Sequence, residues 1–149
     1  MWIGSDSVTP GRVALLHAQG VKVLAEFNTL HVASYVTEHP EAAPLGADGR
    51  PCPPPHAWQG VSPTDAAYRP LRMAAFRELL ATCDLDGVWL DHHHAHASWE
   101  RGDPALPDTG LDRAALAQFH RDTGIRLPDA PTPVVAELLL GRHRAAWTQ

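Results

Sequence analysis

The stretch Asp86-Gly87-Val88-Trp89-Leu90-Asp91 decides the fold, because it is short, strongly apolar and ends on a carboxylate. A cluster of histidines follows it directly, at His92, His93, His94 and His96. Apolar β-forming residues bounded by polar ones indicate a strand. In α/β barrels the chemistry lies where parallel strands end and their loops gather. The stretch therefore predicts one strand of a parallel sheet, with a candidate active site beginning at Asp91.

A second buried strand is predicted over residues 21–28, which are almost uninterrupted in apolar character. It follows a helix that should begin after the N-cap Thr9, with Pro10 in its first turn, and end at Gly20. Further helices are predicted over residues 31–39, from about 68 to 83, over 111–124 and over 132–147. The alternation of helices and strands predicts an α/β fold with helices packed on a parallel sheet.

The chain of 149 residues is long enough for one domain, residues 1–149, but short for a barrel. A complete (β/α)8 barrel needs about 250 residues, and only two strands are evident in the sequence. We therefore expect a partial (β/α)8 TIM barrel, with parallel strands and outer helices, that forms a single incomplete domain. Its uncovered sheet edges favour self-association into a homo-oligomer.

Composition narrows the classes of function. The formal net charge of -5 comes with no recurring basic stripe, which argues against a nucleic-acid partner. No apolar run approaches the roughly 20 residues of a membrane span, and no signal peptide is apparent at Met1. Cys52 and Cys83 make no disulfide framework, so we expect free thiols in a reducing cytoplasm.

Two carboxylates are predicted to converge at the carboxyl ends of the strands. Side chains alternate along a strand, so Glu26 and Asn28 share a face, Asp91 ends the next strand, and His92 is expected on the opposite face from Asp91. Paired carboxylates are what glycoside cleavage requires, with retention expected for a separation near 5 Å and inversion for a wider gap. Glu26 and Asp91 are therefore the candidate catalytic pair. The structural alternatives are a strand-end cap for Asp91 and a buried ion pair for Glu26.

The carbohydrate substrate is expected to be held by polar and aromatic side chains of the surrounding loops. Tryptophan can stack on sugar rings and donate its N–H group, although core packing is the alternative and is expected for Trp89. The proline-rich segment 41–63 is interpreted as an ordered lid. The candidate substrate-binding residues are Asn28, His31, Trp58, His93, His94, His96, Trp99 and Glu100. This hypothesis needs no cofactor and no metal.

Two other hypotheses stay open. His92, His94 and His96 alternate, and with Asp91 or His31 they could bind zinc or another divalent metal, as in a metal-dependent hydrolase. Alternatively, the chain is a non-catalytic remnant that binds sugar or a partner chain.

Three motifs and their order resemble one protein family. They are Val23-Leu24-Ala25-Glu26-Phe27-Asn28, then Glu38-His39-Pro40 with Gly46-Ala47-Asp48-Gly49-Arg50, then the stretch 86–91. Together with Phe119 and Thr123-Gly124, they resemble bacterial glycoside-hydrolase-like TIM-barrel proteins, relatives of α-L-fucosidases and β-galactosidases, over residues 13–127. The resemblance implies O-glycoside hydrolysis with Asp91 at the nucleophile position.

The chain departs from that family in two ways. In the family the acid/base residue usually comes from a later strand, which is not evident in this sequence. A cysteine cluster expected after Pro107-Asp108-Thr109 is also absent, since Gly110, Asp112 and Ala115 stand there.

Overall fold

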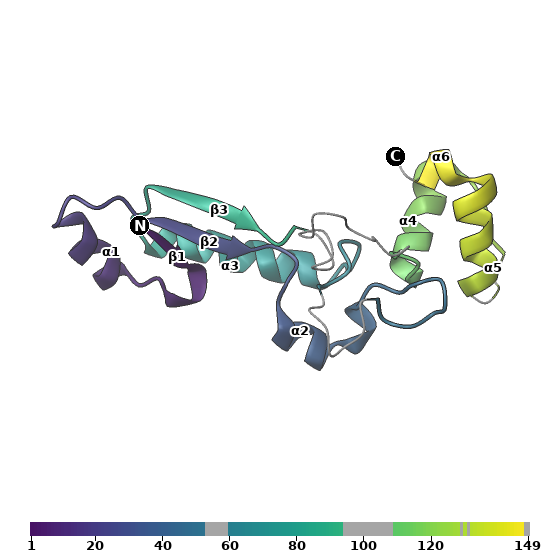
Figure 1. Cartoon of the computed structure of the whole chain (residues 1–149), viewed down its shortest axis with the longest axis horizontal. Coiled ribbons are helices and arrows are strands. Elements are labelled where there is room, and N and C mark those ends of the chain that lie inside the picture. Colours follow the sequence, from purple (N-terminus) through teal and green to yellow (C-terminus); the bar gives the residue numbers. More distant parts are fainter. Residues whose placement is uncertain (53–59, 94–108, 129, 131, 148–149) are drawn as a thin grey trace, which may run out of the picture.

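The protein is described by a computed structural model over residues 1–52, 60–93, 109–128, 130 and 132–147. Three parallel strands form one sheet in the order β1-β2-β3 (Figure 1). They are β1 (Trp2–Gly4), β2 (Leu24–Asn28) and β3 (Gly87–Asp91). The predicted α/β class and the parallel pairing of the two expected strands are confirmed. Strand β1 was not predicted.

Helices join the strands and agree in place with the expected ones. Helix α1 (Pro10–His17) links β1 to β2, and the Thr9 hydroxyl accepts a hydrogen bond from the Arg12 N–H at 3.3 Å, as the predicted cap requires. Between β2 and β3 lie α2 (Ala33–Glu38) and the long α3 (Tyr68–Thr82). Single 3₁₀ turns, η1 (Ser5–Ser7) and η2 (Pro40–Ala42), complete this half of the described chain.

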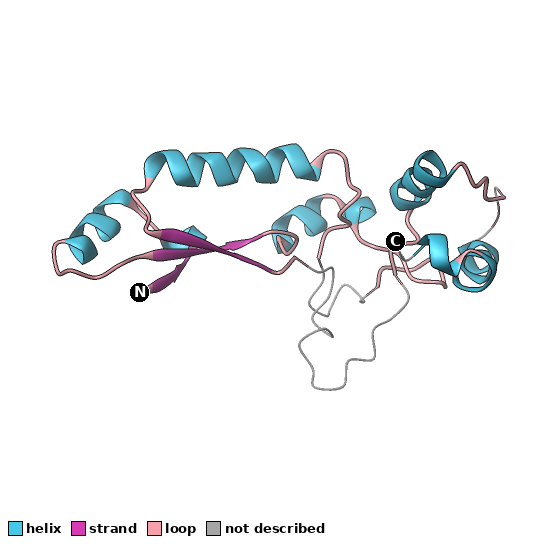
Figure 2. Cartoon of the chain, turned by 90° about the horizontal axis from the view of Figure 1, so that it is seen from above, coloured by secondary structure: helices cyan, strands magenta, loops and turns pink. Residues whose placement is uncertain are grey.

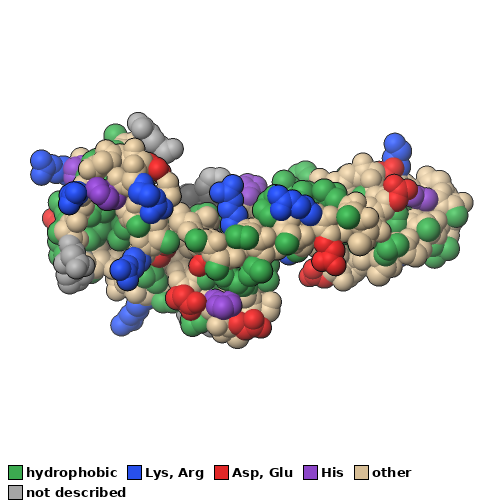
Figure 3. All heavy atoms as spheres, turned by 180° about the vertical axis from the view of Figure 1, so that it is seen from behind, with side chains coloured by type: hydrophobic (Ala, Val, Ile, Leu, Met, Phe, Trp, Pro, Cys, Tyr) green, Lys and Arg blue, Asp and Glu red, His purple; other side chains and the backbone are tan. Residues whose placement is uncertain are grey.

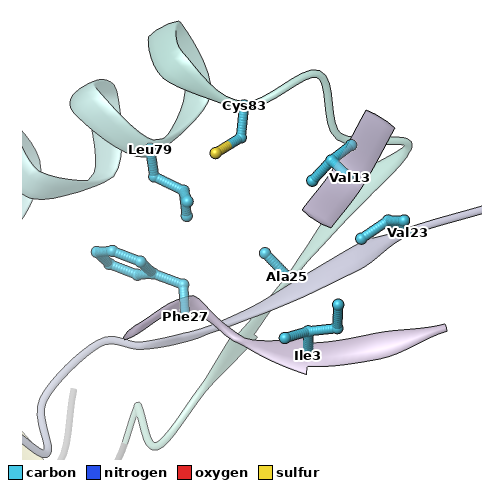
Figure 4. Close-up of a cluster of buried hydrophobic side chains, with 7 residues drawn as sticks. All are labelled: Ile3, Val13, Val23, Ala25, Phe27, Leu79 and Cys83. Carbon is cyan, nitrogen blue, oxygen red and sulfur yellow. The ribbon is translucent and has the colours of Figure 1, made fainter. Parts of the chain in front are cut away.

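One face of the sheet is covered and carries the first hydrophobic core. Figure 4 shows side chains of α1 and α3 lying on the same side of the strands, over Ala25 and Phe27. Alternation explains the arrangement, because these two residues of β2 point to one face while Leu24, Glu26 and Asn28 point to the other. The buried members of this core are Ile3, Val13, Val23, Ala25, Phe27, Leu79 and Cys83.

The remaining helices form a second cluster beyond the carboxyl ends of the strands (Figures 1 and 2). Helix α4 (Arg113–Thr123) is capped by the Asp112 carboxylate, which accepts from the Ala115 N–H at 3.0 Å, and it ends at Gly124 with a left-handed φ of 70°. The buried residues of this cluster come from α4 itself, from the residue before its cap and from the segments that follow the helix. They are Leu111, Phe119, Val135, Ala136 and Leu139.

The single helix expected over residues 132–147 is wrong in detail. The chain instead forms α5 (Thr132–Glu137), the π-helical turn η4 (Leu138–Arg142) and α6 (Arg144–Trp147). Gly141 lies inside the π turn, where a residue of low helix propensity is tolerated because the regular ladder is already interrupted.

Three further observations bear on the sequence-based expectations. Cys52 and Cys83 are both free thiols. None of the helices in the described part of the chain has the length and apolarity that a bilayer crossing requires. Leu71 and Leu80 of α3 are exposed, so the helix predicted from about residue 68 to 83 buries only part of its leucine side chains.

Candidate functional site

The carboxyl ends of β2 and β3 lie side by side and bring the candidate residues together. In the parallel register Asn28 pairs with Asp91, and Glu26 pairs with Trp89. Backbone pairing continues past the strand ends, since the Thr29 N–H donates to the Asp91 carbonyl at 2.8 Å. The site is therefore built on hydrogen-bonded backbone rather than on a free loop.

Glu26, Asp91 and His92 form the chemical centre of this edge. One ligand atom of each, a carboxylate oxygen or a ring nitrogen, lies within 4.8 Å of the other two. All three side chains are half-buried. The structure thus brings together the two carboxylates that sequence analysis paired. They lie on the sheet face that none of the described helices covers, here called the uncovered face.

His92 joins this centre by an unusual backbone conformation. Its φ is 51°, in the left-handed region that few residues other than glycine adopt. The turn lets its backbone N–H donate to Asp91 Oδ1 at 2.7 Å, and its ring Nδ1 hydrogen-bonds with the Asn28 side-chain oxygen. The expectation that His92 faces away from Asp91 is therefore wrong, because alternation of side chains holds only within the strand and the positive φ turns His92 back.

A pair of tryptophans lies beside Glu26 on the same face. The Trp2 indole N–H donates to Glu26 Oε2 at 2.9 Å, and the Trp2 and Trp89 rings are 4.9 Å apart at a tilt of 54°. Both rings are exposed, so the expected core packing of Trp89 is wrong. Sequence analysis missed Trp2 because a three-residue strand carries too little alternation to be recognised.

Two residues of α3 hold the end of β2 in place. The Tyr68 hydroxyl donates to the Thr29 carbonyl at 2.6 Å, and Arg72 Nε donates to the Asn28 carbonyl at 2.6 Å. The Arg72 guanidinium also lies 3.8 Å from the centre of the Phe27 ring. Burial raises the pKa of Tyr68 and lowers that of Arg72, although Arg72 remains a cation at neutral pH. Neither residue was singled out from the sequence.

The other predicted site residues divide into two groups. The His31 ring lies 5.8 Å from that of His92, and His93 follows with an exposed side chain. The rest fall outside the described residues, as does the centre of the expected lid. These are Trp58, His94, His96, Trp99 and Glu100.

The arrangement offers two kinds of chemistry. Two adjacent carboxylates can share acid and nucleophile roles. Two carboxylate oxygens with one imidazole nitrogen also make a ligand set suited to a divalent transition metal. Comparison with known proteins does not distinguish these two possibilities, since no family model, curated protein or solved structure matches the chain. The resemblance to glycoside-hydrolase-like barrels therefore stays a prediction.

Proposed function

We propose that the three strands belong to a (β/α)8-type barrel whose interior is the uncovered face of the sheet. Two observations support this: the three strands of the described sheet are parallel, and the described helices that pack on this sheet lie on one face. A doubly wound sheet would have helices on both faces, whereas a barrel has them only outside. The proposal also accounts for the exposed side chains of Trp2, Leu24 and Trp89 on the other face.

We further propose that the chain acts in the hydrolysis of O-glycosides. The observation that carries this function is the approach of the Glu26 and Asp91 carboxylates to within 4.8 Å at the carboxyl ends of adjacent strands. Retaining glycosidases have carboxyl groups about 5 to 5.5 Å apart, whereas inverting enzymes need a wider gap for water. The proposed reaction therefore proceeds with retention.

Asp91 is the proposed nucleophile and Glu26 the proposed acid and base. An Asp91 oxygen attacks the anomeric carbon while the bond to the leaving oxygen breaks and Glu26 gives that oxygen its proton. Water then attacks the glycosyl ester, Glu26 takes a proton from it, and Asp91 is released as carboxylate. Both residues end as they began.

The surrounding side chains suit a sugar. Trp2 and Trp89 offer exposed aromatic faces next to Glu26, and aromatic faces stack on the C–H surfaces of sugar rings. Asn28 and His31 offer polar groups at the same edge of the sheet, and His93 follows in the chain. The proposed substrate class is therefore a carbohydrate bound in a partly aromatic site.

The test is a panel of aryl glycosides assayed with the whole chain and with Asp91→Asn and Glu26→Gln. Each substitution should lower turnover by about 10²- to 10⁴-fold, the usual contribution of a group of this kind. Asp84→Asn is the matched control, because Asp84 has a 97% exposed side chain near His17, away from the site. Mass spectrometry after reaction with a 2-fluoro glycoside should find the adduct on Asp91. Unchanged turnover in Asp91→Asn rules out its role.

A metal-dependent hydrolase is the second candidate, favoured by the two oxygens and one nitrogen of Glu26, Asp91 and His92. It predicts stoichiometric zinc or manganese in the purified protein, loss of that metal in His92→Gln, and activity that chelator abolishes. Activity indifferent to chelator, in protein without stoichiometric metal, excludes this candidate. Saturable sugar binding without turnover would instead favour the non-catalytic alternative.

A further inference from the structure

A cavity of about 770 Å³ lies between α3 and α4, apart from the Glu26–Asp91 site. Its walls are the segment 63–66, one side of α3, and Gln118 and Arg121 of α4. The volume lies in the range of small-molecule sites, about 300 to 1,000 Å³. Arg69, Met73 and Arg77 line it from successive turns of α3, since residues four apart share a helix face.

The cavity is strongly cationic. Three guanidinium groups line it, from Arg69, Arg77 and Arg121, together with one carboxylate, Asp65. Among the described residues, no carboxylate lies within ion-pair distance of any of these arginines. Figure 3 shows several basic side chains on the face of the molecule that lies behind the sheet in Figure 1. The positive charge is therefore available to a ligand.

The carboxylate of Asp65 is already engaged. It accepts from the backbone N–H groups of Tyr68 at 2.7 Å and Ala67 at 3.1 Å, and from the Tyr35 hydroxyl at 3.2 Å. Asp65 therefore serves the first turn of α3 and neutralises the positive end of that helix. The arginines, and not the helix end, supply the attraction in this cavity.

Arg121 is held in a defined orientation. Its Nη2 donates to Gln118 Oε1 at 2.6 Å, and the Gln118 amide nitrogen donates to the two oxygens of Asp122 at 2.7 Å. This relay uses one end of the guanidinium and leaves donors on the other end. An oriented planar fork suits a phosphate better than a flexible ammonium would.

We infer that this cavity binds a small ligand that carries a phosphate group. The planar guanidinium fork matches phosphate oxygens in pairs, and arginines on two helices can grip one group from two sides. The volume exceeds what a single inorganic anion fills, so the ligand has a body beyond its phosphate, as a sugar phosphate does. The site shares no residue with Glu26, Asp91 or His92, so it stands whether or not the proposed hydrolysis is correct.

The test is isothermal titration of the whole chain with inorganic pyrophosphate, glucose 6-phosphate and uncharged glucose. Both phosphates should bind saturably and more weakly as salt is raised, and glucose should not bind this site. Arg77→Gln and Arg121→Gln should each weaken binding by about tenfold or more, the effect of one lost charge-assisted hydrogen bond. Tighter binding of glucose 6-phosphate than of pyrophosphate would show that the body of the ligand contributes.

Arg142→Gln is the matched control, because it removes the same charge from the exposed Arg142 in η4, which does not line the cavity. It should leave both affinities within about twofold of the starting protein. Thermal circular dichroism of every variant separates a loss of binding from a loss of folding. Absence of saturable phosphate binding, or equal weakening by Arg142→Gln, overturns the inference.

Discussion

The two faces of the sheet differ sharply although the same strands build them. On the covered face Ala25 is 0% exposed and Phe27 is 5% exposed, while on the uncovered face Leu24 is 37% and Trp89 is 49% exposed. Leu24, Ala25 and Phe27 all belong to one five-residue strand. Alternation alone therefore assigns β2 both to the core and to the candidate site.

The difference separates stability from chemistry. Side chains under α1 and α3 remove apolar surface from water, which is the main favourable term in folding. Glu26, Asn28 and Asp91 keep partial contact with water. Their side chains hydrogen-bond with Trp2 and His92, which do not belong to the buried core. Substitutions on the two faces should consequently have different effects, and the predictions below test that in order of size.

The largest effect is expected from Phe27→Ala on the covered face. Phe27 packs against Phe76, with ring centres 5.0 Å apart, and lies under the Arg72 guanidinium. Removing a buried phenyl ring costs about 3 to 5 kcal/mol, from lost transfer energy and the cavity left behind. The free energy of unfolding, measured by urea titration, should fall by this amount.

Leu24→Ala is the comparison on the uncovered face, one strand position away from Ala25. Leu24 lies over Gly87, where an added Cβ would come within 3.5 Å of Leu24 Cδ2, but it is otherwise partly exposed. Its loss should cost about 1 kcal/mol or less, because little apolar surface is returned to water. Equal costs for Phe27→Ala and Leu24→Ala would show that the uncovered face is also covered in solution.

Much of this two-faced arrangement could be predicted from the sequence. The apolar runs predict β2 and β3, and alternation predicts that Glu26 and Asp91 share an edge and a face. Thr9 caps the start of α1 with its side chain, and Gly124 ends α4 in the left-handed conformation. Both caps depend on local residues and can therefore be predicted from the sequence.

What escaped prediction depends on long-range contacts. Trp2 reaches Glu26 only because β1 pairs with β2, and a three-residue strand is defined by its partner rather than by its own pattern. His92 turns back toward Asn28 through a positive φ, which no local residue pattern predicts. The π turn at Leu138–Arg142 likewise interrupts a segment whose apolar spacing suits one helix.

An effect smaller than that of Phe27→Ala is expected from Tyr68→Phe, which tests how the covered side supports the uncovered one. The substitution removes the hydroxyl that donates to the Thr29 carbonyl at 2.6 Å and keeps the ring. The free energy of unfolding should fall by about 1 to 2 kcal/mol, because the half-buried Thr29 carbonyl loses its hydrogen-bond donor. Tyr35→Phe is the matched control, since the Tyr35 hydroxyl donates to the side chain of Asp65 at 3.2 Å and not to the end of β2. Tyr68→Phe should also slow any turnover at Asp91, whereas Tyr35→Phe should not.

The smallest effect is expected at the opposite end of the sheet. There the Asp86 side chain hydrogen-bonds both with α1 and with the residue that precedes β2. Its Oδ2 accepts from the Val23 N–H at 2.7 Å and hydrogen-bonds with His17 Nε2 at 2.9 Å. The Val23 bond is the main cause, and the His17 bond the second, of an Asp86 pKa that lies below its ordinary value. A carboxyl whose folded pKa is depressed adds stability that is fully present above its unfolded pKa, near 3.9, and is lost as pH falls through the folded value.

The free energy of unfolding, measured by urea titration at each pH, should therefore decrease less between pH 6 and pH 3 in Asp86→Asn than in the starting protein. Asp84→Asn is the control, because Asp84 lies 3.8 Å from the His17 ring but is almost fully exposed, so solvent screens its effect. If Asp86→Asn kept the acid sensitivity of the starting protein, other carboxylates would have to carry it. The hydrogen bonds that Asp86 accepts from Val23 and shares with His17 would then not be the source of the acid sensitivity.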